Sequence, residues 1–227
     1  MAQAGTVAEN PVTGERMVFL RTAADTHGQL LRFDHFLKIG GFGPNEHIHP
    51  LQEEHFHVVE GRMGVVLDGQ EHILEEGSDI AIPPGARHTW WNAGDIELHQ
   101  ITEFRPARSF EVFAETLAAL GREEGIYKGL RLTLQFAVLS SSCPDNVYVT
   151  KPPVPVWVQK LAYPILARIA ALFGYRRRYL QYALPEPGSS ARSPHAATGP
   201  LAGGARPSGP GVREPADRLA ERTHGGR

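Results

Sequence analysis

The chain has 227 residues, a formal net charge of −2 and a hydrophobic fraction of 41%, values that are ordinary for a globular protein with one hydrophobic core. Its single cysteine, Cys143, excludes an intramolecular disulfide and fits a reducing compartment. Residues 1–16 lack the basic start and the apolar segment of a signal peptide, so we expect a cytoplasmic protein. We expect residues 1–12 to form a flexible N-terminus.

The segment from residue 31 to residue 38 alternates between apolar and mostly charged side chains. One parity carries Leu31, Phe33, His35 and Leu37. This alternation predicts a strand whose apolar set faces the interior. A histidine in that set is either a hydrogen-bonded core residue or a residue that lines a pocket, and the sequence leaves both interpretations open.

A group of histidine and carboxylate side chains follows, between Gly41 and Gly61. His47 and His49 lie two positions apart, so on a strand they point to the same side. Glu54 lies five positions after His49, and in one unbroken strand this odd spacing would place it on the opposite face. Pro50 cannot donate to a strand ladder, so we expect a turn here that returns Glu54 to the same interior.

The strand that begins near Glu54 sorts its side chains into two sets by parity. Phe56 and Val58 share the parity of Glu54, so we expect them to line the same space. His55 and His57 take the other parity, so we expect them to face outward or into a subunit contact.

The second motif runs from Gly77 to Asn92. Before it, Asp68-Gly69 separates two short apolar runs and predicts a tight hairpin. Within it, the rigid turn at residues 83–85 precedes His88, and Trp90 shares the parity of His88. If the two motifs meet in a barrel, the imidazoles and the carboxylate converge on one point.

The two motifs resemble, at every defining position, the two consensus motifs of the cupin superfamily, and the resemblance covers residues 13–106. The resemblance implies metal ligands at His47, His49, Glu54 and His88. It implies turn glycines at Gly41, Gly61, Gly77 and Gly85. The implied fold is mainly β, a single antiparallel jelly-roll barrel, which agrees with the many short strands and turn residues.

Three imidazoles and one carboxylate without a thiolate suit one divalent transition metal, namely Fe, Mn, Ni, Cu or Zn, and leave positions open for substrate. Five side chains of the expected interior form a mainly apolar wall that suits a small organic substrate: Phe33, His35, Phe56, Val58 and Trp90. We expect a dioxygenase-like enzyme in which Glu54 is both a ligand and the catalytic proton acceptor. A metal-dependent isomerase or cyclase is one alternative and a non-catalytic binding module is another, because the fold does not choose between them.

Residues 107–187 are expected to form a C-terminal α-helical extension. Ser109 can cap a helix whose apolar residues recur at helical spacing from Phe110 to Leu120, and Gly121 can end it. A second apolar stretch, 130–139, is ambiguous. A third segment carries an apolar stripe of Val158, Leu161, Ala162, Ile165, Leu166, Ile169, Leu172 and Phe173.

The stripe of the third segment must be buried somewhere, and we expect it to pack on the barrel or in a homodimer. Because three arginines follow at residues 176–178, contact of 158–178 with an anionic membrane surface is an alternative that we do not favour.

Residues 188–227 are rich in Gly, Pro, Ser, Ala and Arg without periodicity, so we expect a disordered tail. The tail carries six arginines against three acidic residues, a charge of +3, which leaves −5 on residues 1–187. An acidic body argues against nucleic acid as a partner.

Deleting residues 188–227 should leave the melting temperature and the metal content unchanged, because the tail has too few apolar residues to offset the entropy of ordering it. Thermal unfolding of the full and shortened chains checks this. A loss of about 3 °C or more, equivalent to about 1 kcal/mol, would show that the tail packs.

Overall fold

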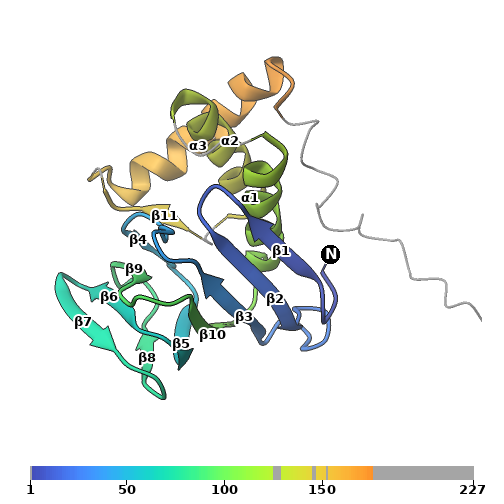
Figure 1. Cartoon of the computed structure of the whole chain (residues 1–227). Helices are drawn as coiled ribbons and strands as arrows, with labels where there is room; N and C mark the ends of the chain where they lie inside the picture. The colour runs from blue at the N-terminus through green and yellow to red at the C-terminus, as the bar shows by residue number, and fades with distance from the viewer. Residues whose placement is uncertain (1, 125–128, 145–146, 152, 176–227) are drawn as a thin grey trace, which may run out of the picture. The chain divides into compact units, whose positions relative to one another are not determined.

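The computed structural model describes residues 2–124, 129–144, 147–151 and 153–175 (Figure 1). The described residues all belong to one compact unit. The expected disordered tail and the arginines at 176–178 lie outside the described residues. Within the described part of the chain, no helix is long and apolar enough to cross a membrane.

Eleven described strands form two sheets in which every strand pair is antiparallel. In spatial order, the larger sheet contains β1 (Val7–Asn10), β2 (Glu15–Arg21), β3 (Leu31–Leu37), β10 (Leu98–Arg105), β5 (Glu53–Glu60) and β8 (Asp79–Ile82). The smaller sheet contains β11 (Tyr148–Val149), β4 (His47–Ile48), β9 (His88–Asn92), β6 (Met63–Leu67) and β7 (Gln70–Leu74). The expected mainly β jelly-roll fold is confirmed.

The turns that position the site follow the sequence. Asp68 and Gly69 both have positive φ, 48° and 84°, and join β6 to β7 as the hairpin that the Asp-Gly pair predicts. The chain turns at Pro50 and Leu51, and β5 then begins at Glu53. This turn directs Glu54 into the same interior as His47 and His49.

The N-terminal boundary differs from the expectation. Residues 7–10, expected to be part of a flexible N-terminus, form β1 and pair with β2. Ala2 and Ala8 are buried in one core cluster with Ala114 and Ala118 of the first helix. The sheet therefore begins before residue 13, because a helix distant in sequence gives these small side chains a surface to pack against.

The three helices of the described residues lie on one side of the strands (Figure 1). They are α1 (Phe110–Glu124), α2 (Gly129–Ser142) and α3 (Val156–Leu172). The ambiguous stretch 130–139 is thus helical. Gly121 does not end α1, which runs through it to Glu124. A Cβ at residue 121 would clash with the side chain of Asn10, so this glycine permits a close approach rather than a helix end.

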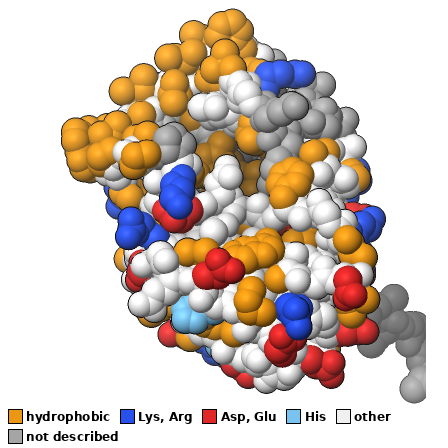
Figure 2. All heavy atoms as spheres, turned by 60° about the vertical axis from the view of Figure 1, so that its left-hand side comes forward, with side chains coloured by type: hydrophobic (Ala, Val, Ile, Leu, Met, Phe, Trp, Pro, Cys, Tyr) orange, Lys and Arg blue, Asp and Glu red, His pale blue; other side chains and the backbone are white. Residues whose placement is uncertain are grey.

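The apolar stripe of α3 is divided between two faces. Ala162 and Leu166 face a cavity, whereas Leu161, Ile165 and Ile169 are exposed. Of the two contacts that the sequence leaves open for the stripe, packing on the barrel therefore does not hold for the second set, and burial in a homodimer stays a prediction. Figure 2 shows hydrophobic side chains gathered on the upper part of the molecule, where Figure 1 places the helices. The eight apolar positions cover more than one side of a helix, and a single contact cannot bury them all.

Candidate metal centre

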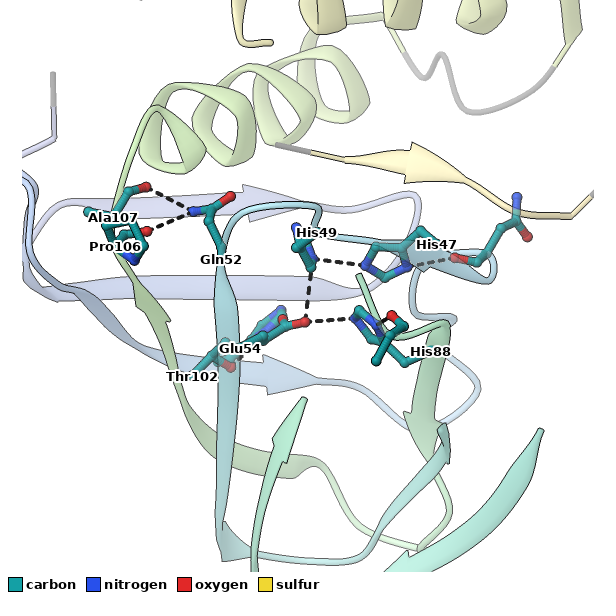
Figure 3. Close-up of polar contacts among 11 residues, drawn as sticks. His47, His49, Gln52, Glu54, His88, Thr102, Pro106 and Ala107 are labelled. Carbon is teal, nitrogen blue, oxygen red and sulfur yellow. Dashed lines mark hydrogen bonds and ion pairs between the residues drawn. The ribbon is translucent and has the colours of Figure 1, made fainter. Parts of the chain in front are cut away.

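Two sheets and one turn bring four ligand side chains together (Figure 3). His47 on β4 and His88 on β9 lie directly opposite each other in an antiparallel pair. His49 follows β4, and Glu54 is the second residue of β5. All four side chains are buried, and their ligand atoms lie within 4.8 Å of one another. The structure thus brings together the four residues that the motifs predict.

The four ligand atoms are three imidazole Nε2 atoms and one carboxylate oxygen. The Nε2 atoms of His47 and His49 are 3.1 Å apart. The Oε2 atom of Glu54 lies 2.8 Å from Nε2 of His88 and 3.4 Å from Nε2 of His49. The four ligand atoms are therefore close enough together to hold one metal ion.

Backbone groups behind two of the imidazoles fix their orientation. Nδ1 of His47 donates to the carbonyl oxygen of Asn45 at 2.8 Å, and Nδ1 of His88 donates to that of Ala86 at 3.1 Å. A hydrogen bond from Nδ1 leaves Nε2 available as the metal ligand, which is the arrangement that supports metal-binding histidines. The donor set and its support fit one divalent transition metal ion, and the donors alone do not select which metal.

The start of β5 is anchored to the segment before α1. Gln52 is fully buried, and its Nε2 atom donates to the carbonyl oxygens of Pro106 and Ala107 at 3.0 and 3.1 Å (Figure 3). Because Gln52 lies two residues before Glu54, these bonds hold the start of β5, which carries the ligand Glu54, against the segment that leads into α1.

The charges of the site are strongly coupled. Burial would raise the pKa of the Glu54 carboxyl, but hydrogen bonds from His49 and His88 outweigh it and hold that pKa well below its ordinary value. Burial would lower the pKa of His88, but the hydrogen bond and the charge of Glu54 outweigh it and raise that pKa. Burial also lowers the pKa of His47 well below its ordinary value, and positive charge on His88 and His49 adds to the effect. Glu54 and His88 therefore form an ion pair that a metal ion must replace.

Metal affinity should fall as pH falls. Because the pKa of His88 is raised above 6.5, an incoming metal ion displaces a proton from it, and that proton is harder to displace in acid. We expect the association constant for zinc to drop about tenfold for each pH unit below that raised pKa, since one displaced proton changes it by about one decade per unit. Calorimetric zinc titrations at pH 8, 7 and 6 measure the slope. Equal affinities at the three pH values would contradict this prediction.

A cavity of about 540 Å³ opens from the metal centre. Three of the four ligands, His47, His49 and Glu54, are part of its wall. Figure 2 shows a hollow with hydrophobic walls between the helices and the barrel. The wall includes three side chains that the sequence assigns to a substrate pocket: Phe33, His35 and Trp90.

Two other predicted wall residues lie elsewhere. Phe56 and Val58 are fully buried in a core cluster with Leu37, Met63 and Leu98, and they are not part of the cavity wall. Parity predicted the correct side of β5, but these residues lie further along the strand than Glu54, where side chains from the other sheet fill the barrel.

His35 contacts several groups around the cavity. Its Nδ1 atom lies 3.4 Å from the Thr102 hydroxyl, and its Nε2 atom lies 3.5 Å from the Glu15 carboxylate. Its ring meets the Trp90 ring edge-on, with centroids 4.8 Å apart. His35 is thus buried and part of the cavity wall at once, which combines the two interpretations that the sequence left open.

The outward histidines behave as their parity predicts. His55 and His57 both approach Asp79, with nitrogen to oxygen distances of 3.3 and 3.1 Å, on the face away from the cavity. They are partly exposed and take no part in the group of four ligands.

Sequence reasoning missed the part of the wall that the helices supply. The cavity is lined by side chains from all three helices: Phe110, Phe113 and Leu117, Leu132 and Phe136, and Ala162, Tyr163 and Leu166. The signal for the first set was present, since the apolar stripe of α1 is visible in the sequence. The sequence did not show that this stripe covers a cavity.

Residues 35–102 match the family model described as a cupin domain. Over 62 residues the chain is 40% identical to polyketide synthase CurC of Streptomyces cyaneus, which covers 27% of this chain and 40% of that protein. The chain therefore spans well under two thirds of this relative. A solved structure, an RmlC-like cupin from Shewanella frigidimarina, is 22% identical with a TM-score of 0.41 and covers 49% of this chain and 92% of that one.

Similarity to a further relative extends beyond the cupin domain. The chain is 29% identical over 163 residues to the protein described as probable oxidoreductase virH of Hypocrea virens, which covers 67% of this chain and 73% of that protein. Since 67% of the chain is more than residues 1–105 hold, this similarity reaches into the helices that follow β10. The family match and the two-sheet fold together identify residues 35–102 as a cupin domain.

Proposed function

We propose that the protein is a metal-dependent oxidoreductase of dioxygenase type that acts on a small organic substrate. The observation that carries the proposal is a buried group of three histidines and one glutamate, of which His47, His49 and Glu54 line a largely apolar cavity. A structural metal site is usually closed, whereas this one faces a space that a substrate can enter. The similarity to a protein described as an oxidoreductase supports the same class.

The residues of the site have separate parts in this proposal. His47, His49, His88 and Glu54 hold a divalent transition metal, which supplies a Lewis acid for substrate oxygens and, where the metal is redox-active, a path for electrons to dioxygen. Glu54 would be both a ligand and the acceptor of a proton from a substrate hydroxyl, because its buried carboxylate lies at the metal centre. Trp90 and Phe33 exclude water from the reacting atoms.

Oxygen consumption tests the proposal. Protein loaded separately with each of Fe(II), Mn(II), Ni(II), Cu(II) and Zn(II) is supplied with phenolic and diketone substrates in an oxygen electrode. We expect uptake that requires both substrate and one redox-active metal, and that falls at least about 100-fold in His88→Ala.

Two other results would contradict the assignment in different ways. Product formation at an unchanged rate without oxygen would indicate an isomerase or a cyclase, in which the metal acts only as a Lewis acid. Stoichiometric ligand binding without turnover by any metal form would indicate a non-catalytic binding module.

A further inference from the structure

A row of aromatic rings leads away from the metal centre. Starting at the ligand His49, successive ring centroids are 5.5 Å to Phe110, 5.7 Å to Phe113, 5.8 Å to Phe136 and 5.9 Å to Tyr163. All five rings are part of the cavity wall. The row crosses α1, α2 and α3 in turn, so the cavity extends from the barrel along one aromatic wall beneath the helices.

The α3 part of this wall is held in place by one buried side chain. Gln159 donates from Nε2 to the carbonyl oxygens of Val149 and Val154, at 2.6 and 2.7 Å, and its Oε1 atom accepts from the hydroxyl of Tyr163. These bonds tie α3 to β11 and to the loop that precedes the helix. The helical wall is therefore preformed rather than dependent on a ligand to order it.

The charges in the wall are few and of one sign. Among the described residues that line the cavity, Glu15 and Glu54 carry the formal charges and none is lysine or arginine. A carboxylate or phosphate on the far part of a ligand would have no cation to pair with there. The wall suits an uncharged apolar body with its oxygens at the metal end.

From these observations we infer that the helical extension makes the site selective for an extended aromatic substrate of two or three fused rings with a chelating oxygen pair at one end. The inference rests on the proposed function and names the substrate class of that site. A cavity of about 540 Å³ is of the size that holds a drug-sized molecule, and a single ring would leave most of it unfilled. Planar rings also pack favourably against aromatic side chains, in offset-stacked or edge-to-face arrangements.

A series of three probes tests the inference. Catechol, 2,3-dihydroxynaphthalene and 2,3-dihydroxyanthracene carry the same pair of adjacent hydroxyls on one, two and three linearly fused rings. Their affinities for zinc-loaded protein are measured by calorimetry. We expect affinity to rise roughly tenfold or more from one ring to two, and again to three, because each added ring leaves water for the aromatic wall. Equal affinities for the three probes would overturn the inference.

A substitution in the helical wall makes the test specific to the extension. Leu166→Trp on α3 fills part of the cavity, so it should weaken the three-ring probe at least tenfold and leave catechol binding unchanged. Leu161→Trp is the matched control, since Leu161 lies on the same helix but is exposed and outside the cavity wall. Equal loss for both probes in Leu166→Trp, with an unchanged melting temperature, would contradict a selective role for the helices.

A second variant covers the case in which Leu166→Trp does not fold. Phe136→Leu removes one ring from the row with little change of volume. It should reduce the ratio of the affinity for the three-ring probe to the affinity for catechol. An unchanged affinity ratio would contradict the inference that the aromatic wall binds the added rings.

Failure of this inference can be told apart from failure of the proposed function. The probe series needs zinc and no turnover, so absence of oxygen consumption with every metal leaves it intact. Ring-independent affinity in protein that binds one zinc ion per chain contradicts the inference alone.

Discussion

Replacing His47 and His49 together with alanine should remove the metal ion from the protein. The double change deletes two of four donors and leaves the buried pair of Glu54 and His88, whose ion pair competes with any incoming cation. Loss of a single supporting hydrogen bond typically lowers metal affinity 10–100-fold, so loss of two ligands should exceed roughly 100-fold. Elemental analysis of protein purified without added metal or chelator should give close to one transition-metal ion per wild-type chain and none in the variant.

The chain offers a matched control for this experiment. His55→Ala with His57→Ala removes the same number of histidines, at the same spacing, from the outer face of the neighbouring strand. This variant should keep its full metal content. If His47→Ala with His49→Ala also keeps one ion per chain, the metal is bound elsewhere and the four-residue site is wrong.

The metal centre was predictable because strand geometry is local. Residues two apart on a strand share a face, so spacing alone places His47, His49 and, after the turn at Pro50, Glu54 on one side. His88 needed a second strand, and no local pattern identifies which strand it pairs with. The resemblance to a family supplied that pairing, and the β4–β9 register confirms it.

The substrate wall was less predictable because it depends on depth and on tertiary packing. Parity correctly assigned Phe56 and Val58 to the interior of the barrel. It could not show that these two side chains lie in the packed core rather than in the cavity wall. The larger omission was the helical wall. Phe113 and Phe136 are separated by 23 positions, and their contact depends on how α1 and α2 dock, which no local pattern states.

At two further positions, a local sequence pattern did not predict the structure. Gly121 has the composition signal of a helix end, yet a close approach to Asn10 of β1 explains it better. Residues 7–10 form too short a run to predict a strand alone, and β2 and α1 give the run its partners. In both positions a contact distant in sequence overrides the local preference.

The outer face of α3 is an apolar surface that the other described residues leave uncovered. It carries Trp157, Leu161, Ile165, Ile169 and Leu172, of which Ile165 is 56% and Leu172 84% exposed. The only charged residues of the helix are Lys160 and Arg168, so self-pairing buries no carboxylate, and their long side chains can reach the rim of a contact. The body of the chain carries −5, which opposes adsorption to an anionic lipid surface. We therefore propose that a second copy of the chain covers this face.

Ile165→Glu with Ile169→Glu should convert a wild-type dimer into a monomer. Each glutamate would place an unpaired charge in an apolar contact, at a cost of roughly 1–3 kcal/mol or more per site, while both positions are open enough in the single chain for its fold to persist. Sedimentation equilibrium gives the mass and thermal unfolding the fold. Ile39→Glu with Ile73→Glu is the control, because these isoleucines are 63% and 46% exposed away from α3.

The competing interpretation predicts a different pattern for the same proteins. If the face binds a membrane surface, the wild type is a monomer that co-sediments with anionic vesicles at low salt, and Ile165→Glu with Ile169→Glu abolishes co-sedimentation without changing mass or melting temperature. The dimer interpretation is supported if the wild type is a dimer that does not co-sediment with such vesicles and the variant is a monomer with the wild-type melting temperature. A monomeric wild type at the concentrations of the experiment contradicts it, because an apolar face of this size in a stable dimer should be buried at micromolar protein.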